Sequence, residues 1–111
     1  MTIRDLGAAL AATGIKTHHY SGYKSAFPYI VWAEDGENSS YADGKRSTKI
    51  ITGTTDYFTE TEYDDNAAAI ENAMAGIGLA FRLNTVLVEN KPSGGIYCIH
   101  YEWAWEAVAD G

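Results

Sequence analysis

Residues 96–108 read Ile96-Tyr97-Cys98-Ile99-His100-Tyr101-Glu102-Trp103-Ala104-Trp105-Glu106-Ala107-Val108, and the other elements can be placed around this segment. Large apolar side chains alternate with polar ones, which is typical of a β-strand with one buried face, because successive side chains point to opposite sides of a sheet. One face carries Tyr97, Ile99, Tyr101, Trp103 and Trp105, and the other carries Cys98, His100, Glu102 and Glu106. We expect the aromatic face to form the core, beneath the helices of the domain.

A second strand precedes this one along the chain. The segment Leu79–Glu89 reads as a strand, and the six residues Asn90–Gly95 that follow it include proline and two glycines. Such residues are typical of turns between strands. The last third of the chain is therefore predicted to be a β-hairpin.

Two helices are predicted from apolar residues at helical spacing. The first begins near Thr2 and ends before Gly14, and its apolar positions are Ile3, Leu6 and Leu10. The second begins at Asp64 or Asp65, both of which suit a helix cap, and Gly76 and Gly78 end it. The buried positions expected in the second helix are Ala67, Ile70, Met74 and Ile77.

Three further segments are rich in β-branched and aromatic residues, and we expect strands at Lys16–Tyr20, Phe27–Ala33 and Lys49–Glu62. The predicted order is α-β-β-β-α-β-β. This order indicates an α+β fold, with a mostly antiparallel sheet and two helices packed on one face. A chain of 111 residues fits a single domain, residues 1–111.

The segment Asp35–Arg46 has the most loop-like sequence. It contains two Asp-Gly pairs, Asp35-Gly36 and Asp43-Gly44, and is much longer than the usual connection of about 4–6 residues. Loops of this length are typically functional or disordered. A long hairpin tip is the alternative, because Asp-Gly favours tight turns.

The composition excludes several classes of function. Eight Lys and Arg against 15 Asp and Glu give a net charge of −7, so we expect no nucleic-acid binding of the kind that clustered basic residues provide. No segment approaches the roughly 20 apolar residues that cross a membrane. The single cysteine, Cys98, cannot form an internal disulfide.

The histidines and Cys98 do not indicate a metal or catalytic site. His18 and His19 are adjacent on a predicted strand and point to opposite faces, so they cannot bind one ion together. Cys98 and His100 share a strand face, but a Cys–His enzyme normally takes its histidine from a distant part of the chain. We expect a packed thiol, no metal, no cofactor and no enzymatic activity.

Carboxylates gather between residues 56 and 71, where no lysine or arginine occurs. The main interpretation is a solvated acidic face with helix caps. The alternative is a contact with a basic partner surface. Paired carboxylates could also serve acid/base hydrolysis of sugars, but a sheet of this size can hardly enclose the cleft required.

Five segments of the chain resemble, in order, the tail-terminator or tail-completion proteins encoded in the head–tail joining region of long-tailed phages and prophages of Gram-positive bacteria. These segments are Pro28–Gly36, Tyr41–Lys45, Gly53–Thr59, Phe81–Asn84 and Ile99–Trp103. The resemblance covers most of the chain. Its motifs are structural and include no catalytic signature.

The resemblance implies an antiparallel sheet flanked by helices in a subunit that assembles as a hexameric ring. Such a ring caps the tail tube, ends its polymerisation and offers a surface for joining the head. The partners implied are further copies of the chain, the tail-tube protein and a head–tail connector protein. The expected location is the virion, at the head–tail junction, after synthesis in the cytoplasm of the bacterial host.

A ring needs heterologous interfaces, in which one surface of each subunit meets a different surface of the next. We expect the 35–46 segment to reach a neighbour, with contacts from Asp35, Glu37, Tyr41, Asp43, Lys45 and Arg46. A second set is expected to form an acidic contact face or to line the lumen, where negative charge would repel DNA: Asp56, Glu60, Glu62, Asp64 and Asp65.

Two other classes of protein remain open at this point. A head–tail connector would also form a ring, but it would bind the portal or adaptor rather than the end of the tube. A small monomeric protein-binding module could use the 35–46 segment to hold its partner. The mass in solution separates the module from the ring-forming proteins.

Overall fold

The computed structural model describes residues 3–21, 25–38, 40–42 and 45–108, and it describes side chains outside the segment 40–48. The elements in chain order are α1 (Ile3–Ala11), β1 (Lys16–His19), β2 (Tyr29–Glu37), β3 (Ser40–Ala42), β4 (Lys45–Thr48), β5 (Ile50–Thr59), α2 (Asn66–Gly76), β6 (Ala80–Asn90) and β7 (Ile96–Val108). Neither helix in this part of the chain has the length and apolar character needed to span a membrane.

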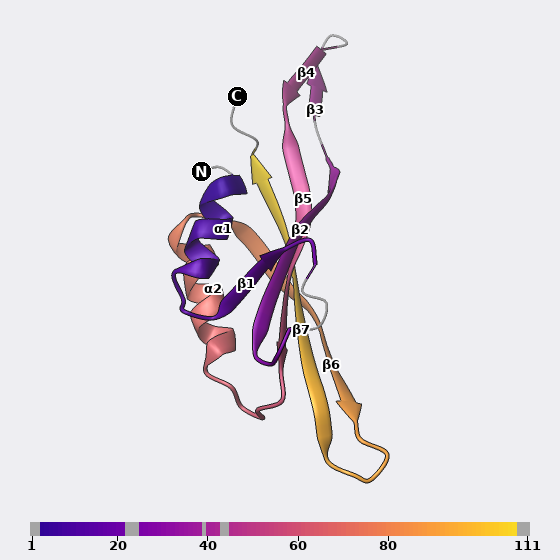
Figure 1. Ribbon diagram of the computed structural model, residues 1–111. Coiled ribbons are helices and arrows are strands. Elements are labelled where there is room, and N and C mark those ends of the chain that lie inside the picture. The colour runs from indigo at the N-terminus through magenta and orange to yellow at the C-terminus, as the bar shows by residue number, and fades with distance from the viewer. Residues whose placement is uncertain (1–2, 22–24, 39, 43–44, 109–111) are drawn as a thin grey trace.

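Five strands form one sheet in the order β1-β2-β5-β7-β6, and β3 and β4 form a separate two-stranded sheet. Within the larger sheet only the β1–β2 pair is parallel. Both helices cover the same face of the larger sheet (Figure 1). The predicted α+β class, with a mostly antiparallel sheet and helices on one face, is confirmed.

The core lies between the helices and this face of the sheet. Leu6 and Leu10 of α1 and Ile70 and Met74 of α2 are fully buried, as their helical spacing predicts. The strands contribute Ile30, Trp32, Tyr57, Trp103, Trp105 and Ala107 to the same cluster. We call this side of the sheet the helix face and the opposite side the open face.

Strand β7 shows the predicted alternation, with one correction. Ile99, Trp103 and Trp105 are buried and Tyr101 packs against the core. Tyr97, predicted to be in the core, is 51% exposed. It lies next to the turn that joins β6 and β7, at the end of the hairpin away from the helices (Figure 1).

The segment 35–46 is a hairpin rather than a loop. Strand β2 continues to Glu37, and β3 and β4 then pair with each other, Ala42 being opposite Lys45. The Asp43-Gly44 pair between them lies outside the described residues. The paired strands therefore correct the expectation of a loop and agree with the alternative of a hairpin tip.

Two hairpins project beyond the part of the sheet that the helices cover. The β2–β5 pair extends at one end of the molecule into β3 and β4, and the β6–β7 hairpin extends at the other end (Figure 1). The radius of gyration is 15.7 Å and the extents are 60 × 26 × 22 Å, whereas a compact chain of this length has a radius of about 13 Å. The projecting hairpins make the subunit elongated.

Candidate functional site

The open face of the sheet carries no helix, and a row of rings crosses it. Tyr29 on β2 lies opposite Phe58 on β5, and Phe58 lies opposite His100 on β7. The ring centroids are 4.8 Å apart in the Tyr29–Phe58 pair and 4.3 Å apart in the Phe58–His100 pair, and both pairs are stacked. Stacking across three strands fixes the plane of the His100 imidazole.

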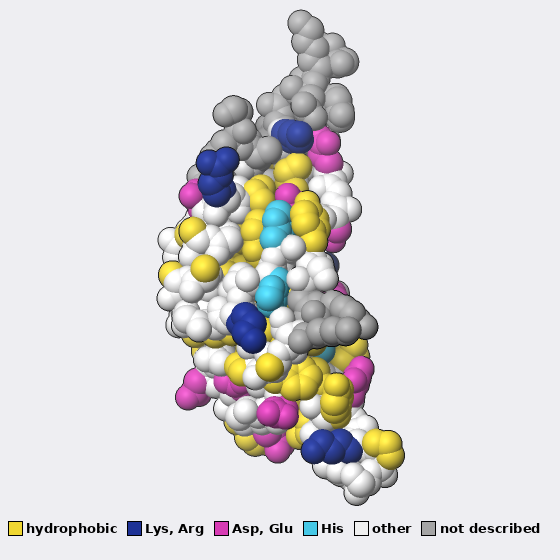
Figure 2. Space-filling view, viewed as in Figure 1, with side chains coloured by type: hydrophobic (Ala, Val, Ile, Leu, Met, Phe, Trp, Pro, Cys, Tyr) yellow, Lys and Arg dark blue, Asp and Glu magenta, His cyan; other side chains and the backbone are white. Residues whose placement is uncertain are grey.

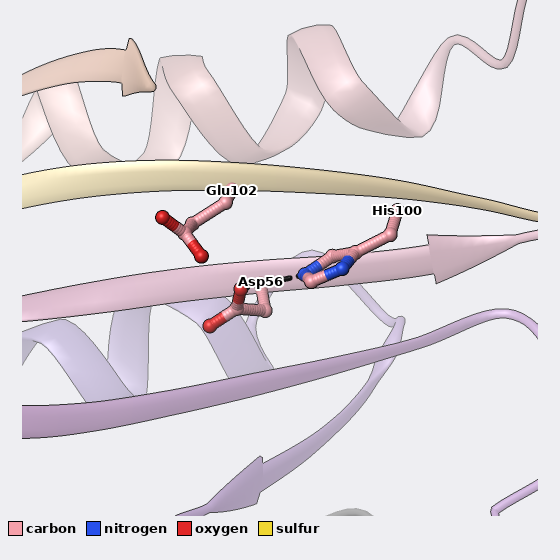
Figure 3. Close-up of side chains that lie close together, drawn as sticks. All are labelled: Asp56, His100 and Glu102. Carbon is pink, nitrogen blue, oxygen red and sulfur yellow. Dashed lines mark hydrogen bonds and ion pairs between the residues drawn. The ribbon is translucent and has the colours of Figure 1, made fainter. Parts of the chain in front are cut away.

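Next to this row, Asp56, His100 and Glu102 form a group that we call the polar cluster. Asp56 on β5 is the direct cross-strand partner of Glu102 on β7. His100 lies two residues before Glu102, on the same face of β7. The His100 Nε2 atom lies 2.7 Å from Asp56 Oδ1. One ligand-type atom from each of the three side chains lies within 4.8 Å of the other two. Figure 3 shows the three side chains close together on β5 and β7.

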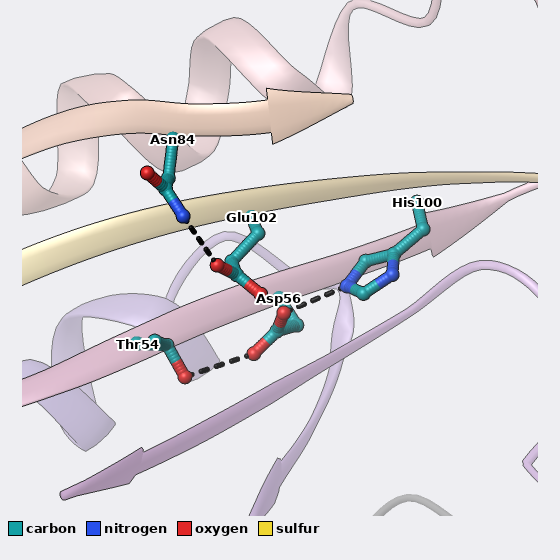
Figure 4. Close-up of polar contacts among 5 residues, drawn as sticks. All are labelled: Thr54, Asp56, Asn84, His100 and Glu102. Atoms are coloured by element: carbon teal, nitrogen blue, oxygen red, sulfur yellow. Dashed lines mark hydrogen bonds and ion pairs between the residues drawn. The ribbon is translucent and has the colours of Figure 1, made fainter. Parts of the chain in front are cut away.

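Two further side chains hold the carboxylates of the polar cluster. The Thr54 hydroxyl donates to Asp56 Oδ2 at 3.0 Å, and the Asn84 side-chain amide donates to Glu102 Oε1 at 2.8 Å (Figure 4). Asn84 belongs to β6, so residues of three neighbouring strands fix this group. In chemical terms the cluster offers one imidazole nitrogen and two carboxylates, a donor set that can bind a divalent ion.

The sequence indicated that His100 and Glu102 share a face but did not identify Asp56 as their partner. Asp56 and His100 are separated by 44 positions in the chain, and only the register of β5 on β7 brings them together. Thr54 and Asn84 were missed for the same reason. The alternation around Asp56, with Thr54 and Phe58 on the same face, was the only signal available.

The surroundings of Cys98 differ from those of a reactive thiol. The thiol is buried, and its pKa is raised by burial and by the nearby negative charge of Glu89. The thiol therefore stays protonated at neutral pH. A nucleophilic cysteine, in contrast, needs a lowered pKa so that the thiolate is present. This placement agrees with the expected packed thiol.

The two neighbouring histidines lie in different environments, as the strand geometry predicts. His18 Nε2 is 2.6 Å from the Ser25 hydroxyl, whereas His19 Nε2 is 2.6 Å from Glu34 Oε1. The His19 ring is also stacked on Trp32, with centroids 3.7 Å apart. Figure 2 shows histidines beside hydrophobic side chains on the middle of one face of the molecule.

The five carboxylates expected to share an acidic face are separated in the structure. Asp56 points to the open face, whereas Asp64 is bound beneath α2 on the other side of the sheet. The other three, Glu60, Glu62 and Asp65, are exposed between β5 and α2.

Asp64 fastens the start of α2 to strand β5. Its carboxylate accepts hydrogen bonds from the Tyr57 hydroxyl at 2.5 Å, the Thr59 hydroxyl at 2.7 Å and the Asn66 backbone amide at 2.9 Å. Burial alone would raise the pKa of Asp64, but these hydrogen bonds outweigh it and lower the pKa. Burial and the bond to Asp64 raise the pKa of Tyr57 to about 12.

Of the residues expected at an interface, Asp35 and Glu37 are exposed on β2, where the strand leaves the body of the sheet. Asp35 accepts a hydrogen bond from Thr52 at 2.7 Å and lines a hollow of about 450 Å³. Tyr41, Lys45 and Arg46 lie on β3 and β4, but their side chains are outside the described part, as is the whole of Asp43. The structure therefore gives the backbone pairing of β3 and β4 but not the side-chain contacts of Tyr41, Lys45 and Arg46.

Strand β6 is an edge of the sheet and exposes a group of apolar side chains. Leu83, Val86, Leu87 and Val88, which we call the edge patch, are between 43% and 55% exposed. Across the described residues, no strand pairs with the outer edge of β6. A long apolar edge strand is a surface on which another chain readily adds.

No family model matches this chain, and no curated protein matches it in sequence.

Proposed function

We propose that this protein is a structural component of a long-tailed phage or prophage, located in the virion at the head–tail junction. It forms a ring, a hexamer by analogy with the proteins it resembles, that caps the tail tube, ends tube polymerisation and joins tail to head. The resemblance of five segments to tail-terminator proteins motivates this proposal. The partners proposed are copies of the chain, the tail-tube protein and a connector protein.

The observation that carries the proposal is the pair of hairpins at opposite ends of the subunit. Heterologous contacts join two different surfaces of identical subunits, and such contacts close into a ring when the rotation permits. A subunit with one extension in each direction can contact two neighbours, or a neighbour and the tube, without changing its fold. The elongated shape, 60 Å against 26 and 22 Å, is consistent with this use.

The edge patch supplies a second argument for assembly. Its four apolar side chains are exposed in the single chain, and an interface would remove them from water. Strand addition along β6 would also satisfy its free backbone groups. We assign this edge to the contact between neighbouring subunits.

The acidic surface proposed to line the lumen of the ring is smaller than the sequence suggested, because its five carboxylates do not share one face. Asp64 is used inside the fold, so the acidic residues available to a lumen between β5 and α2 are Glu60, Glu62 and Asp65. Negative charge at that surface would let DNA pass without binding. Reversing all three charges should slow DNA ejection while rings still form, and unchanged ejection would remove this assignment.

The proposal is tested by tube growth. Tail-tube protein of the same phage or prophage is polymerised with and without this protein, and tube lengths are measured by electron microscopy. The proposal expects shorter tubes with extra density at one end. Tubes of unchanged length with bare ends would contradict it, and binding to a portal or adaptor instead would favour a head–tail connector.

A further inference from the structure

The polar cluster has the composition and arrangement of a metal site that the proposed function does not require. We propose that Asp56, His100 and Glu102 together bind one divalent transition-metal ion of the zinc class on the open face of the sheet. The inference is independent of ring formation.

The donor set selects the class of ion. An imidazole nitrogen with two carboxylate oxygens is a combination that suits Zn²⁺, Co²⁺ or Ni²⁺. Ca²⁺ takes six to eight oxygen ligands, and Mg²⁺ prefers an octahedral shell of oxygens. Three protein ligands leave a coordination position for water or for a group from a partner.

The distances fit an ion after small side-chain movements. Donors about 2.0–2.1 Å from a tetrahedral ion lie about 3.3 Å from one another. His100 Nε2 and Asp56 Oδ1 are now 2.7 Å apart, and all three groups offer atoms within 4.8 Å. Binding would replace the hydrogen bond between Nε2 and Oδ1 by a bond from each atom to the ion.

Charge favours the same conclusion. Asp56 and Glu102 are like-charged residues placed directly opposite each other, an arrangement that destabilises a sheet. No lysine or arginine of the described part forms an ion pair with either carboxylate. A divalent ion held between the two carboxylates would offset both negative charges.

Side chains around the polar cluster contact its three proposed ligands, as the side chains behind the ligands do in metal sites. Thr54 and Asn84 each bind one oxygen of a carboxylate, and Phe58 stacks on the imidazole. All three ligands lie on adjacent central strands rather than on loops. Such outer groups orient ligands before the ion arrives.

The test is titration of the full-length protein with Co²⁺, followed by visible absorption, and with Zn²⁺ in competition. We expect one ion per chain and a tetrahedral Co²⁺ spectrum that Zn²⁺ abolishes. His100→Ala and the milder Glu102→Gln should each remove this spectrum, and Asn84→Ala should weaken binding about 10- to 100-fold. Circular dichroism and thermal unfolding identify any variant that fails to fold.

His18→Ala is the matched control, because His18 is also a strand histidine whose Nε2 has a side-chain hydrogen-bond partner, Ser25, and it lies outside the polar cluster. It should bind Co²⁺ as the wild type does. The proposal is overturned by the absence of stoichiometric binding, or by folded Glu102→Gln protein that binds with unchanged affinity. Because the isolated chain is measured, this result does not depend on whether rings or capped tubes form.

Discussion

Gly53 on β5 and Trp105 on β7 are cross-strand partners, and the Trp105 indole occupies the space that a β carbon at residue 53 would need. The carbonyl oxygen of Ala33 on β2 closes the same space from the other side. Glycine is therefore required here by the close packing of three strands. The burial of Trp105, which is 2% exposed, depends on this contact.

Gly53→Ala is expected to destabilise the fold by about 1–3 kcal/mol, the usual cost of overpacking a core. The added carbon meets backbone and a buried ring, neither of which can move freely. Urea unfolding measures the change. The control is Gly76→Ala at the end of α2, where no atom lies near the new carbon; it should be neutral or slightly stabilising. Equal stability of the two variants would contradict the assigned packing.

Glu71→Ala is expected to lower the free energy of unfolding by about 1–3 kcal/mol, because it leaves a buried donor without an acceptor. In the wild type the Trp103 indole N–H donates to Glu71 Oε2 at 2.7 Å, joining β7 to α2. Glu71→Gln keeps an oxygen acceptor for the indole N–H and should therefore lower the free energy of unfolding by less. If the alanine and glutamine variants unfold at the same urea concentration, the bond contributes nothing.

Asp64 is expected to make the free energy of unfolding fall as the pH is lowered into the acid range. Its pKa is lowered in the folded chain from an ordinary value of 3.8, so folding favours the ionised form. This contribution is complete well above pH 3.8 and is lost as the pH falls through the folded-state pKa. Asp64→Asn should be less stable at neutral pH and should lose less stability on acidification. Parallel pH curves for the two proteins would argue against this role.

Val86→Lys and Val88→Lys on β6 are expected to block assembly without unfolding the chain. Both valines are about half exposed, and a lysine on an edge strand opposes the addition of another strand. Val108→Lys, at a similarly exposed valine of β7, is the control and should still assemble. Analytical ultracentrifugation and thermal unfolding measure both properties. Normal rings from the β6 variants would exclude this edge from the interface.

The sequence was sufficient to predict the fold class and most of the buried positions, because the patterns that indicate them are local. The alternation of β7 identified the buried face, and the spacing of Leu6, Leu10, Ile70 and Met74 located the helix contacts. The prediction that Tyr97 lies in the core was wrong, because alternation shows which face of the sheet a residue is on. It does not show where along the strand the helices stop covering that face. The 35–46 hairpin was open to two interpretations, since Asp-Gly pairs occur in loops and in tight turns alike.

The polar cluster could not be predicted, because it depends on register. Residues 56 and 102 become neighbours only when β5 and β7 pair with the observed alignment, and no local pattern specifies that alignment. The acidic stretch was misleading for a related reason. Asp56 and Asp64 are near in sequence but lie on opposite faces of the sheet.

The central claim is that this subunit assembles into a ring at the end of a tail tube. The most direct measurement is the mass of the purified protein across concentration, with and without the tail-tube protein of the same phage or prophage. The account predicts a ring of six times the 12.1 kDa chain, formed alone or on the tube end. A chain that stays at 12.1 kDa at every concentration and never binds tubes would contradict it.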